Sequence, residues 1–153
     1  MDLCDDKPYA ISQLVPTVVG EKYNLTFFLN QNSKCGASNK TGYVGVTGTP
    51  GTVFYYNAAE FKGWRHISYS FTANTARTNV TIGSSTTGAC GPVIDLVSLH
   101  LITKTPPNLI VNGDFELHAA KYCSKAFCHL SSNKAIEPWF SSTGTFEIGN
   151  DLF

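Results

Sequence analysis

Short runs of β-branched and aromatic residues, separated by Gly, Pro, Asn and Ser, recur along this chain and constrain its fold more than any other feature. The alternation is clearest in residues 66–72 (HISYSFT). There Ile67, Tyr69 and Phe71 must share one face of a strand, because successive side chains point to opposite faces. That face should pack against the core, and the opposite face should be exposed to solvent. Helical periodicity is hard to find, so an all-β fold is predicted.

Seven such runs occur in the first two thirds of the chain, a spacing typical of a β-sandwich or barrel. The predicted strands are Ala10–Val15, Tyr23–Leu29, Tyr43–Thr47, Thr52–Tyr56, Arg65–Ala73, Asn79–Ile82 and Val93–Thr103. Loops are expected at residues 48–51 and 83–88. Residues 104–108 (KTPPN) read as a linker, because two prolines are incompatible with a helix and with a central strand. Beyond it, strands are expected at Asn108–Phe115 and Thr145–Ile148, with Cys123 and Cys128 in an intervening loop.

Composition narrows the classes of partner. A chain of 153 residues with 42% apolar residues can build the core of one domain. Only 14% of residues are charged and the net charge is zero, which argues against nucleic acid and anionic membrane as partners. A surface rich in Ser, Thr, Asn and Gly suits neutral polar ligands such as sugars. No apolar run approaches the roughly 18 residues of a membrane span, and the N-terminal residues lack the features of a signal peptide, so either a signal was removed or the chain is a fragment.

The cysteines and the glycosylation sequons favour an extracellular protein. The five cysteines show neither a CxxC motif nor the Cys/His spacing of a zinc site, so disulfides are the better interpretation. Three Asn-x-Thr sequons begin at Asn24, Asn39 and Asn79, which are the predicted glycosylation sites.

Catalytic residues are scarce in the sequence. Glu137 and Glu147 are the conceivable glycosidase pair, but no motif sets their separation. The four histidines share no metal-binding spacing, and no serine lies in a Gly-x-Ser-x-Gly nucleophile elbow. The sequence therefore predicts a protein that is not an enzyme.

Exposed aromatic residues are the candidates for sugar binding, because an aromatic ring stacks on the C–H face of a pyranose and loses little conformational entropy. For Trp139 and Trp64, packing in the core is favoured over stacking on a sugar. Tyr55 and Tyr56 must point to opposite faces of a strand, so one of them should face outward. Tyr55, Tyr56 and, more weakly, Trp64 are therefore the predicted carbohydrate-binding residues.

Three motifs carry a family resemblance: NGDFE at residues 112–116, AISQLV at residues 10–15 followed by GEKYNLTF at 20–27, and CGPVID at 90–95. Together they resemble the domain-of-unknown-function 642 family of cell-wall-associated proteins and its relatives among galactose-binding-like carbohydrate modules. The resemblance covers nearly the whole chain. It implies a galactose-binding-like β-sandwich of the jelly-roll type, and a non-catalytic extracellular module that binds cell-wall or matrix polysaccharide. It also implies two alternatives: an interaction module that regulates a wall enzyme such as a pectin methylesterase, and a structural adhesive repeat.

The motif order departs from the family pattern, in which the NGDFE strand opens the domain and the CGPVID strand closes it. Residues 1–105 then supply the later strands of a sandwich and residues 106–153 its opening strands. Either the second segment completes the same sandwich, as in a circular permutation, or it starts a truncated second repeat. Closure is favoured because the alternative leaves exposed sheet edges, with a strand-swapped dimer as its competitor.

The resemblance also implies a Cys35–Cys90 disulfide and a structural Ca²⁺ bound by Asp95 and Glu116 between the opening and closing strands. Alternatively, Asp95 caps a turn or bonds backbone amides, and Glu116 is simply exposed. Cys123 and Cys128 are close enough in sequence for a local bridge that leaves Cys4 over, but the sequence does not select the pairing.

Overall fold

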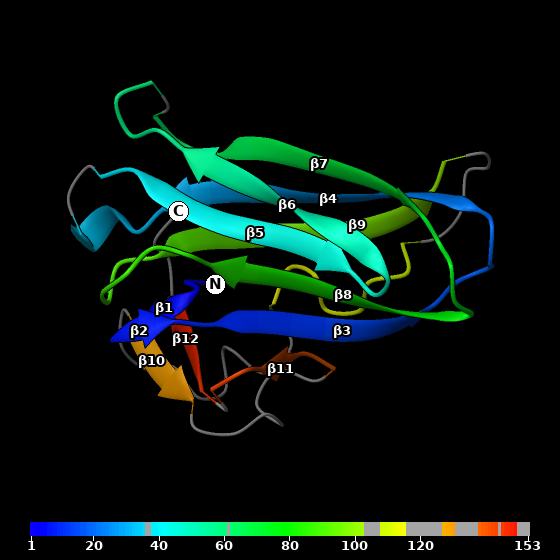
Figure 1. Ribbon diagram of the computed structural model, residues 1–153. Coiled ribbons are helices and arrows are strands. Elements are labelled where there is room, and N and C mark those ends of the chain that lie inside the picture. Colours follow the sequence, from blue (N-terminus) through cyan, green and yellow to red (C-terminus); the bar gives the residue numbers. More distant parts are fainter. Residues whose placement is uncertain are drawn as a thin grey trace.

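Two antiparallel sheets pack face to face in the computed structural model of this protein (Figure 1). The structure describes residues 1–35, 38–60, 62–102, 108–115, 127–130, 138–143 and 145–149. Within these ranges the only helix is a single 3-10 turn, η1 (Ser33–Cys35), and no helix there is long and apolar enough to cross a membrane. The predicted all-β sandwich is confirmed.

The larger sheet has five strands and the smaller sheet has three. In spatial order the larger sheet contains β11 (Phe140–Ser141), β3 (Ala10–Pro16), β8 (Arg77–Ser84), β5 (Lys40–Val46) and β6 (Thr49–Tyr56). The smaller sheet contains β7 (Arg65–Thr72), β4 (Lys22–Gln31) and β9 (Pro92–Leu101). Two short pairs complete the described strands: β1 (Cys4–Asp5) with β2 (Lys7–Pro8), and β10 (Phe127–Leu130) with β12 (Phe146–Gly149).

All seven strands predicted before the linker are present, as β3 to β9. The predicted loop at residues 48–51 is wrong in part, because β6 already begins at Thr49. Pro50 fits there since β6 is an edge strand, whose outward N–H groups need no partner. The loop predicted at residues 83–88 starts later, because β8 continues through Ser84. Cys128 lies in strand β10 rather than in a loop.

The strand predicted at Asn108–Phe115 is wrong. Asn112 and Phe115 have φ angles of 51° and 60°, in the left-handed region that extended strands do not use. We call residues 108–115 the closing segment. It runs beside β9, where the Leu109 N–H donates to the Leu99 carbonyl (3.0 Å) and the Val97 N–H donates to the Gly113 carbonyl (2.8 Å). The edge of β9 is thus covered without a regular strand.

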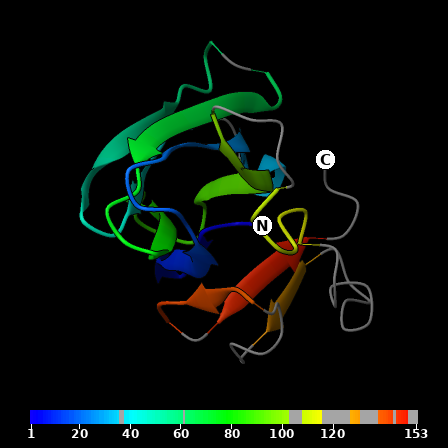
Figure 2. The same ribbon diagram turned by 90° about the vertical axis from the view of Figure 1, so that its right-hand side faces the viewer.

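A buried glutamine joins the closing segment to the opposite sheet. The Gln13 side chain in β3 is 2% exposed. Its Nε2 donates to the Val111 carbonyl (3.1 Å), and the Val111 N–H donates to its Oε1 (3.1 Å). Because β3 belongs to the larger sheet and β9 to the smaller one, the closing segment bridges the two layers on this side (Figure 2, yellow).

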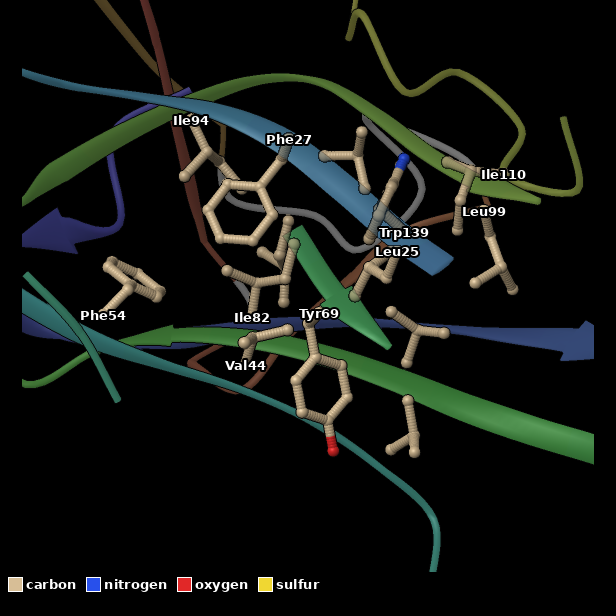
Figure 3. Close-up of a cluster of buried hydrophobic side chains, with 14 of the residues drawn as sticks. Leu25, Phe27, Val44, Phe54, Tyr69, Ile82, Ile94, Leu99, Ile110 and Trp139 are labelled. Atoms are coloured by element: carbon tan, nitrogen blue, oxygen red, sulfur yellow. The ribbon is translucent and has the colours of Figure 1, made fainter. Parts of the chain in front are cut away.

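The core lies between the inner faces of the two sheets and includes side chains from the closing segment. Tyr69 and Phe71 are buried and Ile67 packs against the core, which confirms the face predicted for β7. Trp139 is 0% exposed; its ring centroid lies 5.3 Å from that of Phe115, and its indole N–H donates to the Asn112 carbonyl (2.9 Å). Figure 3 shows this tryptophan together with Leu25, Leu99 and Ile110.

The described parts of residues 106–153 pack on the strands of residues 1–105. β11 pairs with β3 through Phe140↔Ser12 and Ser141↔Ile11, and Ile110 and Phe115 belong to the hydrophobic core. Whether the second segment completes one permuted domain, rather than exchanging between chains or starting a second repeat, stays a prediction.

The predicted Cys35–Cys90 disulfide is confirmed, with the two Cα atoms 5.8 Å apart. It links η1 to the loop just before β9 across 55 residues, a loop length for which chain entropy stabilises the fold by about 4 kcal/mol. The buried Cys4 Sγ lies 3.1 Å from Ser84 Oγ and donates to the Thr86 carbonyl. Cys123 lies outside the described residues, so the Cys123–Cys128 bridge stays a prediction.

The Gln13 contact can be tested by substitution. We expect Gln13→Ala to lower the free energy of unfolding by about 1–3 kcal/mol, because two hydrogen bonds to Val111 are lost. Urea denaturation measures the change.

Ser12→Ala is the matched control, since Ser12 points to the opposite face of β3, and it should change stability by less than about 0.5 kcal/mol. Equal stability of Gln13→Ala and the unsubstituted protein would contradict the bridging role.

Light scattering on the unsubstituted protein tests whether the sandwich closes within one chain. Closure within one chain predicts a monomer, and an obligate dimer would refute it.

Candidate functional site

The two adjacent tyrosines of β6 point in opposite directions, as predicted. Tyr55 is 61% exposed on the outer face of the larger sheet. Tyr56 is 1% exposed, and its hydroxyl donates to the Gly63 carbonyl (3.1 Å). The Tyr56 ring therefore has no face open to a ligand, and placing it among the sugar-stacking residues is corrected. Tyr55 remains a candidate.

A second exposed tyrosine, not singled out from the sequence, lies on the same face. Tyr43 in β5 is 39% exposed and pairs with Val53, while its strand neighbour Thr41 pairs with Tyr55. Tyr43 and Tyr55 thus occupy diagonal positions, which are about 7–8 Å apart on a sheet. Both rings are within reach of one sugar chain. The signal in the sequence was the alternation of Tyr43 with Val44 and Val46, which predicts that Tyr43 points outward when the valines are buried.

A glycine makes room for the Tyr43 ring on the sheet surface. Gly83 in β8 pairs with Tyr43, and a Cβ atom at this glycine would lie 2.4 Å from the tyrosine Cζ. The ring therefore extends over the backbone of β8 instead of standing clear of the sheet. We call the surface formed by Thr41, Tyr43, Val53, Tyr55, Thr81 and Gly83 the tyrosine face.

The tyrosine face continues into a groove between the edge strands of the two sheets, β6 and β7. This edge groove has a volume of about 420 Å³. Tyr55 lines it from β6, and Arg65, His66 and Ser68 line it from β7. The Arg65 Nη1 donates to the Tyr55 carbonyl (2.7 Å), which joins the two edges.

The two tryptophans differ in exposure. Trp139 is a core residue, as expected. Trp64 is half-buried immediately before β7, next to Arg65. It therefore stays a weaker candidate for sugar binding than the exposed Tyr55.

A second cleft, of about 470 Å³, forms where β9 bulges. Thr26 pairs with Ser98 but Phe28 pairs with Asp95, so β9 carries extra backbone opposite Phe27. Leu96 in the bulge has a φ of 49°, and the next N–H, that of Val97, bonds the closing segment. The lining of this bulge cleft includes Thr26, Phe28, Ser98, Asn108, Asn112 and Asp114.

Comparison with known proteins assigns the family. A family model described as a protein of unknown function, DUF642, matches residues 1–100, about two thirds of the chain. The chain belongs to the DUF642 family. No curated protein matches it. The matched range of this DUF642 protein contains the tyrosine face, the edge groove and the β9 bulge, while the closing segment lies beyond it.

The calcium prediction for this DUF642 protein concerns Asp95 and Glu116. Burial raises the pKa of Asp95, the hydrogen bond from the Leu96 N–H (2.7 Å) partly offsets this, and the carboxylate of Asp114 raises it further. Asp95 thus bonds a backbone amide, the alternative considered for it. Glu116 lies outside the described residues, so the predicted metal pair is untested. In the described part of the chain, no three His, Cys, Asp or Glu side chains cluster as metal ligands.

The predicted glycosylation sites are accessible or partly accessible. Asn39 is exposed, and Asn24 and Asn79 are half-buried on outer strand faces. The side chains of Asn24 and Asn39 accept hydrogen bonds through Oδ1. A glycan attaches at Nδ2 instead. Glycosylation itself stays a prediction.

The structure does not test the conceivable catalytic pair. Glu137 lies outside the described residues, and Glu147 is described by its backbone in β12. The prediction that the protein is not an enzyme is therefore unchanged.

The raised pKa of Asp95 makes stability depend on pH. A carboxyl group whose pKa is higher in the folded than in the unfolded state costs no folding free energy while both states are protonated, below its ordinary pKa of 3.8. The cost grows as the pH rises from there to the folded-state pKa and is then constant. Asp95→Asn removes this cost and keeps an oxygen for the Leu96 N–H, so its melting temperature should exceed that of the unsubstituted protein at about pH 7 and match it at about pH 3.

Thermal melts across this pH range measure the difference. Glu60→Gln, at an exposed turn position, is the control and should show no such pH-dependent gain. A lower melting temperature of Asp95→Asn at neutral pH would contradict a cost of burying the Asp95 charge.

The unsubstituted protein and Asp95→Asn also test the calcium prediction. Ca²⁺ should raise the melting temperature of the unsubstituted protein but not that of Asp95→Asn. A melting temperature insensitive to Ca²⁺ and to EDTA would rule the ion out.

Proposed function

We propose that this DUF642 protein is a non-catalytic extracellular module that binds cell-wall or matrix polysaccharide on its tyrosine face. The observation that carries the proposal is the pair of exposed tyrosines, Tyr43 and Tyr55, at diagonal positions of one sheet surface. Aromatic rings held on a rigid sheet bury the C–H faces of sugar rings at low entropic cost.

The surroundings of the two rings suit a neutral, hydroxyl-rich ligand. Thr41 and Thr81 provide hydroxyl groups on the same face, and Gly83 leaves room for the Tyr43 ring to lie against the sheet. An open surface with two stacking contacts of about 1 kcal/mol each supports modest affinity, as expected for a module that binds a repetitive polymer.

Two further features support an extracellular role. The Cys35–Cys90 disulfide is of the kind that persists in oxidising compartments. The surface is poor in charge, with 14% charged residues in the whole chain. We also propose that the sandwich belongs to the galactose-binding-like group and that a structural Ca²⁺ near Asp95 stabilises it.

A second candidate function is an interaction module that regulates a wall enzyme such as a pectin methylesterase. The observation that favours it is the open edge formed by β6 and β7, because edge strands can pair with a strand of another protein. A purely structural, adhesive repeat is the third candidate.

Substitution of the tyrosines tests the carbohydrate proposal. We expect Tyr43→Ala and Tyr55→Ala each to weaken binding to wall polysaccharide by about 3- to 10-fold, and the double variant to lose it, because each removes one stacking surface of about 0.5–1.5 kcal/mol. Affinity gel electrophoresis in gels containing wall polysaccharides measures the loss.

Phe140→Ala is the matched control, since Phe140 is an exposed aromatic residue on β11, at the far edge of the same sheet. It should bind like the unsubstituted protein. Circular dichroism should be unchanged in all variants. Undiminished binding by the double variant would contradict the proposal, and recovery of a wall enzyme with flat binding across a glycan array would favour the second function.

A further inference from the structure

We propose that an N-glycan attached to Asn79 lies along β8 over the tyrosine face and competes there with polysaccharide. Binding then depends on whether this asparagine is glycosylated and on how far its glycan has been trimmed. The inference rests on the proposed function, and it adds a means by which the same face is regulated.

The position of Asn79 is the first observation. Asn79, Thr81 and Gly83 alternate along β8 with buried residues, so they form one row on the outer face of the larger sheet. The ring of Tyr43 lies over the last residue of this row, Gly83. The sequon asparagine and the tyrosine ring are therefore in line along β8, about 13 Å apart at the usual rise of a strand.

The side chain of Asn79 can carry a glycan without losing a contact. Its backbone is fixed by Thr47, whose Oγ1 accepts from the Asn79 N–H (3.0 Å) and whose N–H donates to the Asn79 carbonyl (3.1 Å). Within the described part of the chain, no hydrogen bond involves its carboxamide. The carboxamides of Asn24 and Asn39, in contrast, accept hydrogen bonds through Oδ1. Of the three sequons, the one in line with Tyr43 thus has the least constrained side chain.

The surface beside this row is flat and uncharged. Thr81 pairs with Gly45 of β5, and a Cβ atom at Gly45 would lie 3.3 Å from the Cα atom of Gly51 in β6. None of these three residues has a bulky or ionised side chain. A neutral chain of sugar rings can therefore lie against the sheet without desolvating a charge. The core of an N-glycan is such a chain, with several pyranose rings, so it is long enough to reach Tyr43.

Tethering makes a weak contact between the glycan and Tyr43 sufficient for competition. A ligand held by a short flexible link acts at an effective concentration in the millimolar range. The polysaccharide itself has modest affinity, because it depends on the same stacking contacts of about 1 kcal/mol each. The bulk of the glycan also excludes a polymer from the surface that it covers. We therefore expect the glycan to weaken polysaccharide binding by about 3- to 10-fold.

Two variants that each keep one sequon test this inference. Asn24→Gln/Asn39→Gln keeps the sequon at Asn79. Asn39→Gln/Asn79→Gln keeps the sequon at Asn24, on the outer face of the smaller sheet, and is the matched control. Both are secreted from a host that attaches high-mannose glycans, and mass spectrometry of peptides measures occupancy. Endoglycosidase H then trims each glycan to one N-acetylglucosamine, which is too short to span about 13 Å of strand.

Two measurements are made before and after trimming. Nitration of Tyr43 by tetranitromethane, followed by peptide mass spectrometry, reports how far the ring is covered and needs no polysaccharide. Affinity gel electrophoresis with xyloglucan, galactan and methyl-esterified galacturonan reports binding. In the variant that keeps Asn79, trimming should speed nitration of Tyr43 by at least about 3-fold and tighten binding by about 3- to 10-fold. In the control, trimming should change neither.

An unoccupied Asn79 would overturn this inference. So would trimming that leaves the nitration rate of Tyr43 unchanged, or that leaves binding no tighter in a protein that binds. In those cases the proposed function still stands if the trimmed protein binds polysaccharide and the Tyr43→Ala/Tyr55→Ala double variant does not. If trimming exposes Tyr43 but the trimmed protein binds none of the three polysaccharides, the proposed function is wrong and the glycan only covers the aromatic surface.

Discussion

The amide group of Gln13 and the backbone of Val111 form the contact on which the closed side of this sandwich depends. Two hydrogen bonds there connect β3 in one sheet to the closing segment, which in turn bonds β9 in the other sheet. A sandwich of five and three strands leaves edges that must be covered on at least one side to avoid association. The closing segment covers β9 and delivers Phe115 to Trp139 in the core.

Closure on one side leaves the other side for binding. β6 and β7 remain edge strands, joined by the bonds from Arg65 to the Tyr55 carbonyl and from the Tyr69 hydroxyl to the Pro50 carbonyl. The tyrosine face and the edge groove lie next to each other there. The same core that buries Tyr56 directs Tyr55 outward, because neighbouring residues of a strand point to opposite faces. Fold and candidate site therefore follow from one alternating pattern.

Local alternation predicted the strands well, because burial on one face has a period of two that can be read from neighbouring residues. It failed at Asn108–Phe115, where the partner of Val111 is the side chain of Gln13, 98 residues away, which no local pattern reveals. The outward direction of Tyr55 was predictable from the same alternation. Its diagonal position relative to Tyr43 across β5 and β6, and the contact with Arg65, depend on strand register and edge position, which come from tertiary packing.

The most direct test of the account is to map a bound oligosaccharide on the protein by amide NMR spectra. Titration with a wall oligosaccharide should shift the amide signals of Thr41, Tyr43, Val53 and Tyr55 and leave those around the β9 bulge in place. Shifts confined to Leu96, Ser98 and Asn112 at the bulge cleft, or no shifts at all, would contradict binding on the tyrosine face.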